Sequence, residues 1–292
     1  MKKCVAFTYL FTLLITCFCA LRCQASEIII VADEKLTPVV EIISGIKKAV
    51  SVSTKIISHT DVHGKLKGIV EKEKAKVVVA LGNDALNEAL QLPPEIPVIY
   101  DLVVTPPKIS RANVTGFYMA IPVSQYLDLI KTYLRSIKRI TVIGNRDQLN
   151  VLASDVPQQV NLKGVSNNSE LVNALQQSNG TDAILILPDD ILLTDEIMKK
   201  AYLLSFRNGI PLLGFSEKQV KKGALLALMA DTIYVGKQIG YCAKKVLRGS
   251  PIGQLSPSPP VHFEIFLNTE TAQKMKIKIP NELLHKAKRV YD

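Results

Sequence analysis

The chain has 292 residues, of which 48% are hydrophobic, and its formal net charge is +10. This length and apolar content suffice for one large domain or two lobes of ordinary size with well-filled cores. Aromatic residues make up only 6% of the chain and tryptophan is absent, whereas nucleic-acid binding requires a concentrated basic stripe interleaved with aromatic side chains. Composition therefore predicts no nucleic-acid partner. It favours a solvated basic surface, with attraction to an anionic membrane surface as the milder alternative.

The first segment in chain order has the pattern of a secretory signal. Lys2 and Lys3 precede an apolar run over residues 5–21, and Ala25 ends a stretch suited to signal cleavage. We expect residues 1–25 to be a cleaved signal peptide, which predicts a periplasmic or other extracytoplasmic location. The alternative is a retained membrane anchor, but the apolar run is marginal against the roughly 20 residues that a spanning helix needs.

The positions of the cysteines are consistent with cleavage after residue 25. Of the five cysteines, only Cys242 lies beyond residue 25, so cleavage would leave no partner for an intramolecular disulfide. A lipid anchor at Cys17 or Cys23 is an alternative to a free N-terminus. Thr16 and Arg22, the residues before those cysteines, are poor matches to a lipidation signal.

Beyond residue 26, short β-branched runs alternate with amphipathic helical stretches. The run over 27–32 lacks polar alternation and predicts a strand buried on both faces. The first series continues with strands at 54–58, 77–81 and 98–103 and helices at 37–50, 65–74 and 83–92.

A second series begins near residue 120. Its predicted strands are 140–143, 160–165, 183–187, 211–215, 225–229 and 261–267, and its predicted helices are 124–137, 146–153, 170–177, 194–207, 233–247, 269–275 and 281–290. Repeated β-α-β units predict parallel sheets with helices on both faces. The fold class is therefore α/β, with two doubly wound Rossmann-like lobes, a multi-strand hinge and a ligand cleft between the lobes. We expect 26–120 plus 231–262 to form one lobe and 121–230 plus 263–292 to form the other.

The sequence offers no recognisable catalytic device. It contains no G-x-S-x-G elbow, no P-loop, no H-E-x-x-H motif and no G-x-G-x-x-G after the first strand. His59 and His63 have a spacing that could hold a metal on one helical face. Their place between a strand and a helix favours loop residues instead. The sequence therefore predicts no enzyme activity, no metal and no cofactor.

Polar and aromatic residues follow many of the predicted strands. In doubly wound folds, ligands bind beyond the carboxyl ends of the strands. A helix N-terminus there favours anions, a tyrosine can bound an apolar ligand, and a carboxylate can pair with an amine. The predicted ligand-binding residues are Gly82, Asn83, Asp84, Tyr100, Asp101, Tyr118, Asn145, Asp189, Ser216 and Asp231.

Short motifs in a specific order carry a family resemblance over nearly the whole chain beyond the leader. They are Val79–Ala85, Asn113–Gly116, Ile121-Pro122, Leu127–Ser136, Lys138–Ile140, Asp182–Ile184, Pro188-Asp189, Ile210–Leu212, Val220–Ala224, Asp231–Gly236, Lys245–Gly249, Leu267–Ala272 and Ile279–Leu284. On these motifs the chain resembles the substrate-binding proteins of ABC transporters with a type I periplasmic-binding-protein fold, in the group that includes tryptophan- and tyrosine-type binding proteins.

The pattern and the resemblance together predict a function. We expect an exported, monomeric solute-binding protein that captures a small molecule, such as an amino acid or related metabolite, and delivers it to an ABC permease. The alternative is a sensory module of the same fold, read by a partner such as a histidine kinase.

Overall fold

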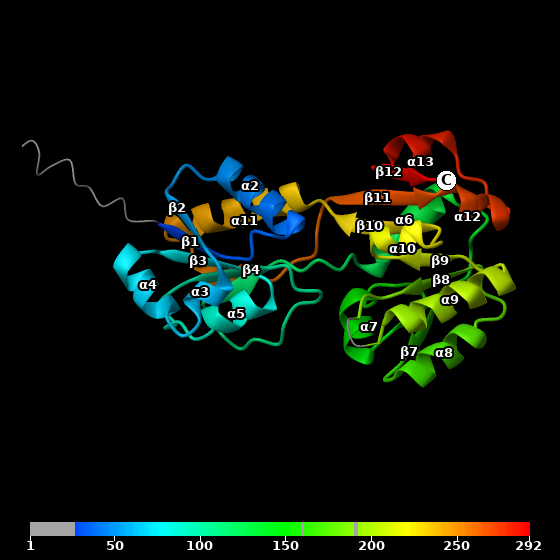
Figure 1. Cartoon of the computed structure of the whole chain (residues 1–292), viewed down its shortest axis with the longest axis horizontal. Coiled ribbons are helices and arrows are strands. Elements are labelled where there is room, and N and C mark those ends of the chain that lie inside the picture. Colours follow the sequence, from blue (N-terminus) through cyan, green and yellow to red (C-terminus); the bar gives the residue numbers. More distant parts are fainter. Residues whose placement is uncertain (1–26, 159, 190–191) are drawn as a thin grey trace, which may run out of the picture.

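The structure is a computed structural model that describes residues 27–158, 160–189 and 192–292. The described chain forms two lobes that lie side by side along the long axis of the molecule (Figure 1). Each lobe has its own mainly parallel sheet, of five and seven strands respectively. The predicted fold class is confirmed. The predicted signal peptide lies outside the described residues.

Lobe 1 is built on the five-stranded parallel sheet, in the order β2-β1-β3-β4-β5. Its elements are β1 (Ile28–Val31), α2 (Thr37–Ala49), β2 (Thr54–Ile57), α3 (His59–Val62), α4 (Leu66–Glu73), β3 (Val77–Leu81), α5 (Asn83–Ala89), β4 (Val98–Asp101), β5 (Val114–Gly116), α11 (Thr232–Leu247) and the 3-10 helix η1 (Ile252–Gln254). Alternate strand residues such as Ile29 and Ile30 enter separate cores, one packed with α4 and α5 and the other with α2 and α11. The continuous apolar runs of β1 and β3 are thus buried on both faces, as expected.

Lobe 2 is built on the seven-stranded sheet, in the order β12-β11-β10-β9-β8-β6-β7. Its elements are α6 (Val123–Tyr133), β6 (Ile140–Gly144), α7 (Arg146–Leu152), β7 (Asn161–Gly164), α8 (Asn168–Gln176), β8 (Ala183–Ile186), α9 (Asp195–Asn208), β9 (Leu212–Gly214), α10 (Glu217–Lys221), β10 (Leu226–Ala230), β11 (Phe263–Asn268), α12 (Thr269–Lys274), α13 (Asn281–Lys286) and β12 (Arg289–Tyr291). The described strands pair in parallel except β10 with β11.

The described chain crosses between the lobes at 117–122, at 231 and at 258–262. These segments are joined by backbone hydrogen bonds, from Tyr118 N to Ser258 O (3.3 Å) and from Asp231 N to His262 O (3.0 Å). Paired crossing segments of this kind can act as a hinge. We propose that the lobes divide at the predicted boundaries, which fall inside these segments.

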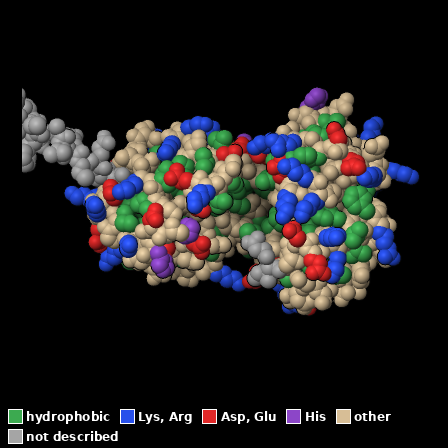
Figure 2. Space-filling model, in the orientation of Figure 1, with side chains coloured by type: hydrophobic (Ala, Val, Ile, Leu, Met, Phe, Trp, Pro, Cys, Tyr) green, Lys and Arg blue, Asp and Glu red, His purple; other side chains and the backbone are tan. Residues whose placement is uncertain are grey.

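The crossings fix which sheet edges meet. β5 leads directly into the crossing at 117–122, and β10 ends just before the crossing at 231. Because β3 and β4 run parallel to β5, and β8 and β9 run parallel to β10, the carboxyl ends of these strands in each sheet face the other lobe. Figure 2 shows the surface hollowed between the two lobes.

Several elements differ from the sequence-based expectation. The helix expected over 281–290 ends at Lys286, and β12 follows it. Backbone pairing of Arg289–Tyr291 with β11 satisfies hydrogen bonds at the sheet edge and overrides the local helical pattern. The short elements β5, α3 and α10 were not predicted, because three to five residues carry too little periodicity.

Candidate ligand-binding site

The lobe 1 side of the interlobe surface contains a cavity of about 420 Å³. Gly82, Asn83 and Asp84 line it together, at the junction of β3 and α5. The other lining residues are Asp33, Leu36, Pro38, Val39, His59, Leu81, Ala85 and Leu102. The cavity combines an apolar wall with acidic groups that could pair with an amine.

Local backbone geometry places the polar groups of this cavity. Gly82 has φ = +99°, a conformation that non-glycine residues rarely adopt, and its amide donates to the Asp101 carbonyl (2.8 Å). The chain can therefore turn sharply from β3 into α5. The Asp84 side chain is 80% exposed, so its carboxylate is accessible to a ligand. Asp84 Oδ2 lies 3.9 Å from His59 Nε2.

Tyr100 and Asp101 at the end of β4 and Tyr118 in the crossing segment after β5 are all buried. Their exposed fractions are 2%, 0% and 7%. Within the described chain, neither Asp101 carboxylate oxygen nor the Tyr100 hydroxyl has a hydrogen-bond partner. Burial raises the pKa of Asp101 to about 7. Burial, and then the nearby Tyr118 and Asp101, raise the pKa of Tyr100 to about 12, and burial also raises the pKa of Tyr118.

The lobe 2 wall brings Asn145 and Asp189 into direct contact. Asn145 follows β6 and Asp189 follows β8, its neighbour in the sheet. Asn145 Nδ2 donates to Asp189 Oδ2 (2.8 Å), while Asn145 Oδ1 accepts from Gln148 N (2.8 Å) and begins α7. Asp189 Oδ1 accepts from Leu192 N (2.8 Å). Two predicted site residues thus form one fixed polar pair.

Ser216 follows β9 and Asp231 follows β10, and each caps the helix that comes next. Ser216 Oγ accepts from Gln219 N (3.3 Å), and Asp231 Oδ1 accepts from Tyr234 N (2.9 Å). Both side chains are half-buried. Asp231 also lies on a crossing segment, where its amide donates to the His262 carbonyl.

Sequence reasoning missed several residues here. Asp33 and His59 follow β1 and β2, so the strand-end rule would have included them if it had been applied to every strand. Gln148 is a buried residue of α7, and its Oε1 has no hydrogen-bond partner in the described part of the chain. Nothing in the sequence marks it. Lys108 Nζ meets Asp147 Oδ2 at 3.0 Å, an exposed ion pair that joins the loop after β4 to α7.

The two histidines with metal-like spacing have separate partners. His59 lies near Asp84, and His63 Nδ1 contacts Glu88 Oε1. Among residues 27–158, 160–189 and 192–292, no group of three or more His, Cys, Asp or Glu side chains is placed to hold a metal ion. The arrangement at the strand ends can instead bind a small molecule by charge, hydrogen bonds and apolar contact. Fold and site define a two-lobed, ligand-binding type of protein.

Comparison with known protein families identifies the family of this chain. Residues 58–291 match the family described as ABC transporter substrate binding protein, and the chain belongs to that family. The predicted resemblance is confirmed. Proteins of this family are extracytoplasmic ligand-binding proteins and in general are not enzymes. No helix in the described part of the chain is long and apolar enough to cross a membrane.

Individual relatives are distant. The chain is 25% identical over 223 residues to a tyrosine-binding protein of Clostridioides difficile, an alignment that covers 70% of this chain and 64% of that relative. A ligand-free, open substrate binding protein with adhesive properties from Clostridium difficile has a TM-score of 0.66 at 17% identity, covering 91% of this chain and 99% of the other. A Streptococcus pneumonia ABC domain in complex with L-Trp has a TM-score of 0.56 at 19% identity, covering 90% and 99%. These structures show the fold.

Proposed function

We propose that this protein captures an amino acid or a closely related metabolite between its lobes and delivers it to an ABC permease. The observation that carries the proposal is the meeting of strand ends from both lobes, with Asp84 on one wall and the Asn145–Asp189 pair on the other. An amino acid carries both an amine and a carboxylate, which suit acidic and amide groups respectively. The ten residues predicted from the sequence are proposed as the binding residues, and of these Tyr100, Asp101 and Tyr118 are buried.

Aromatic amino acids are the first ligands to test. The apolar part of the lobe 1 cavity, with Leu36, Leu81 and Leu102, suits a large side chain. The relative named as a tyrosine-binding protein and the fold neighbour solved with L-Trp support the same choice. The proposal includes export through the signal peptide, function as a monomer, and no catalytic turnover of the ligand.

Thermal unfolding with a panel of amino acids tests the ligand class. A true ligand at 100 times its dissociation constant should raise the free energy of unfolding by about 2.7 kcal/mol. We expect L-tyrosine or L-tryptophan to do so and their decarboxylated amines not to. If no amino acid or related metabolite shifts the unfolding temperature, the proposal fails.

Asp84→Ala should weaken ligand binding by about tenfold or more, because hydrogen bonds to charged groups contribute roughly 1.5–3 kcal/mol. Asp84 is exposed, so the variant should fold normally. Glu71→Ala is the matched control, since Glu71 is exposed on α4 at the opposite end of the sheet. Isothermal titration of both variants measures the effect. Equal affinities in the two variants would remove Asp84 from the site.

Mass spectrometry of the protein recovered from its native host tests the predicted export. Cleavage after Ala25 should give an unmodified N-terminal Ser26. An acylated Cys17 or Cys23 would contradict that prediction and would establish a lipid anchor.

A further inference from the structure

A second concavity lies on lobe 2, away from the strand ends that form the candidate site. It has a volume of about 400 Å³ and lies between α6, the turn that leads into β6 and the segment that leads into β7. β6 and β7 begin here, so this groove is at the end of the sheet opposite the cleft. Its lining residues are Leu127, Ile130, Lys131, Arg135, Ile137, Lys138, Ile140, Pro157 and Val160.

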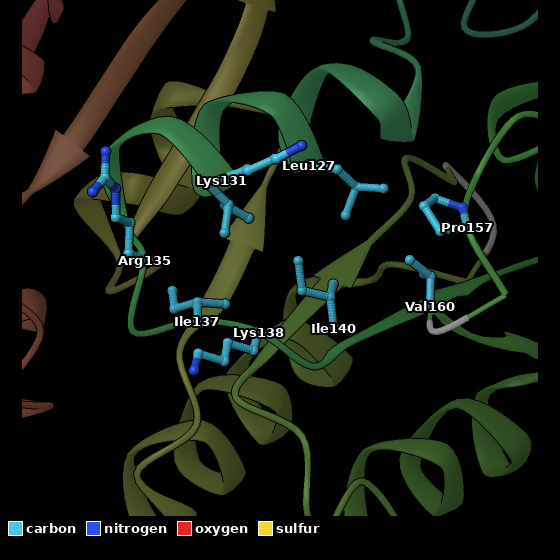
Figure 3. A pocket seen from close by; sticks show the side chains of 9 residues that line it. Leu127, Lys131, Arg135, Ile137, Lys138, Ile140, Pro157 and Val160 are labelled. Atoms are coloured by element: carbon cyan, nitrogen blue, oxygen red, sulfur yellow. The ribbon is translucent and has the colours of Figure 1, made fainter.

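The groove is divided into an apolar floor and a cationic rim. Ile130, Ile137 and Ile140 are each less than a tenth exposed and form part of the floor. Figure 3 shows Arg135 and Lys138 at one end of the groove and Pro157 and Val160 at the other, while Lys131 lies on α6 between them.

The three cations of the rim are available to a ligand. Lys131, Arg135 and Lys138 are exposed, and in the described part of the chain none of them has a salt-bridge partner. The nearby Asp182 is already matched, because it accepts from the Lys138 and Arg139 amides and pairs with the Arg139 guanidinium. None of the described residues that line the groove is acidic. The site therefore favours an anionic group at its cationic end.

The apolar floor determines the chemistry of the rest of the ligand. Among the described lining residues, no side chain accepts hydrogen bonds, so the N–H groups of a peptide backbone would find no side-chain partner. The floor isoleucines are recessed, so they cannot insert into a bilayer. An alkyl chain has no polar groups that need partners, and it is narrow enough to reach the recessed isoleucines.

We infer that this groove binds a single-chain anionic amphiphile, such as a long-chain carboxylate. The carboxylate lies near Arg135 and Lys138, and the alkyl chain runs along the floor toward Pro157 and Val160. This site is separate from the cleft, so binding there is independent of an occupant between the lobes.

Titration with hexanoate, octanoate, decanoate and dodecanoate below their micelle concentrations tests the inference. Affinity should rise with chain length by up to about fourfold per methylene buried. The corresponding 1-alkanols should bind at least tenfold more weakly than the carboxylates, and added salt should weaken carboxylate binding.

Charge reversal locates the site. The double substitution Arg135→Glu and Lys138→Glu should weaken decanoate binding at least tenfold. Lys67→Glu with Lys72→Glu is the matched control, because it makes the same change in net charge on exposed residues of α4 in lobe 1. Chemical shifts of Ile137 and Val160 should move with decanoate in the parent and the control. Equal affinity in both double variants, no dependence on chain length, or binding only to anionic vesicles or to an acidic peptide would overturn the inference.

Discussion

Replacing Gly236 with alanine is expected to lower the free energy of unfolding by about 3 kcal/mol or more. Gly236 lies in α11 where that helix packs against α2. An added Cβ would lie 2.1 Å from the Ile42 carbonyl oxygen and 3.0 Å from Gly45 Cα. Both obstacles are backbone atoms, so no side-chain rotation relieves the clash. The helices would have to separate, which would open the core that they form with the sheet.

Urea unfolding of Gly236→Ala measures this cost. Gly68→Ala is the control, since Gly68 lies in α4 and a Cβ added there would have no neighbouring atom within 4 Å. Alanine there should stabilise the protein by up to about 1 kcal/mol, as expected from helix propensity. If the two variants unfold at the same urea concentration, the close packing of α2 and α11 is not a major source of stability.

This contact also shows where sequence reasoning ends. The helix that contains Gly236 is predicted well, because its apolar residues recur at helical spacing and Gly249 follows its basic last turn. Its partner Gly45 lies nearly two hundred residues earlier, and residues 121–230 of lobe 2 come between them. The sequence alone does not reveal that two glycines so far apart meet. Pairing between distant segments also formed β12, which local pattern had assigned to a helix.

The sequence also predicted only part of the candidate site. The rule that ligands gather beyond strand ends placed Gly82, Asn83 and Asp84 in one cavity and brought Asn145 to Asp189. The rule depends only on strand order, which alternating β and α segments indicate. It could not show which way a strand-end residue points. Asp101 ends β4 like the others, yet its carboxyl group is fully buried.

The buried Asp101 carboxyl should make stability depend on pH. Its ordinary pKa is 3.8 and burial raises the pKa of the folded state to about 7, so between those values the folded protein holds a proton that the unfolded chain has lost. Stability therefore falls as pH rises through this range and levels off above pH 7. At 1.36 kcal/mol per pKa unit, the full loss is about 4 kcal/mol, of which roughly 2–3 kcal/mol falls between pH 5 and pH 7.

Asp101→Asn should remove this dependence, since asparagine stays neutral at every pH. Relative to the parent, the variant should gain about 2–3 kcal/mol in free energy of unfolding between pH 5 and pH 8. Comparing the two proteins cancels the titration of groups that they share. Tyr100 and Tyr118 stay neutral throughout, because burial raises the pKa of each hydroxyl. The Asp84→Asn variant is the control for an aspartate-to-asparagine change at an exposed site. Urea unfolding at half-unit steps provides the measurement, and parallel profiles for the parent and Asp101→Asn would show that the Asp101 carboxyl is already ionised in the folded protein at pH 5.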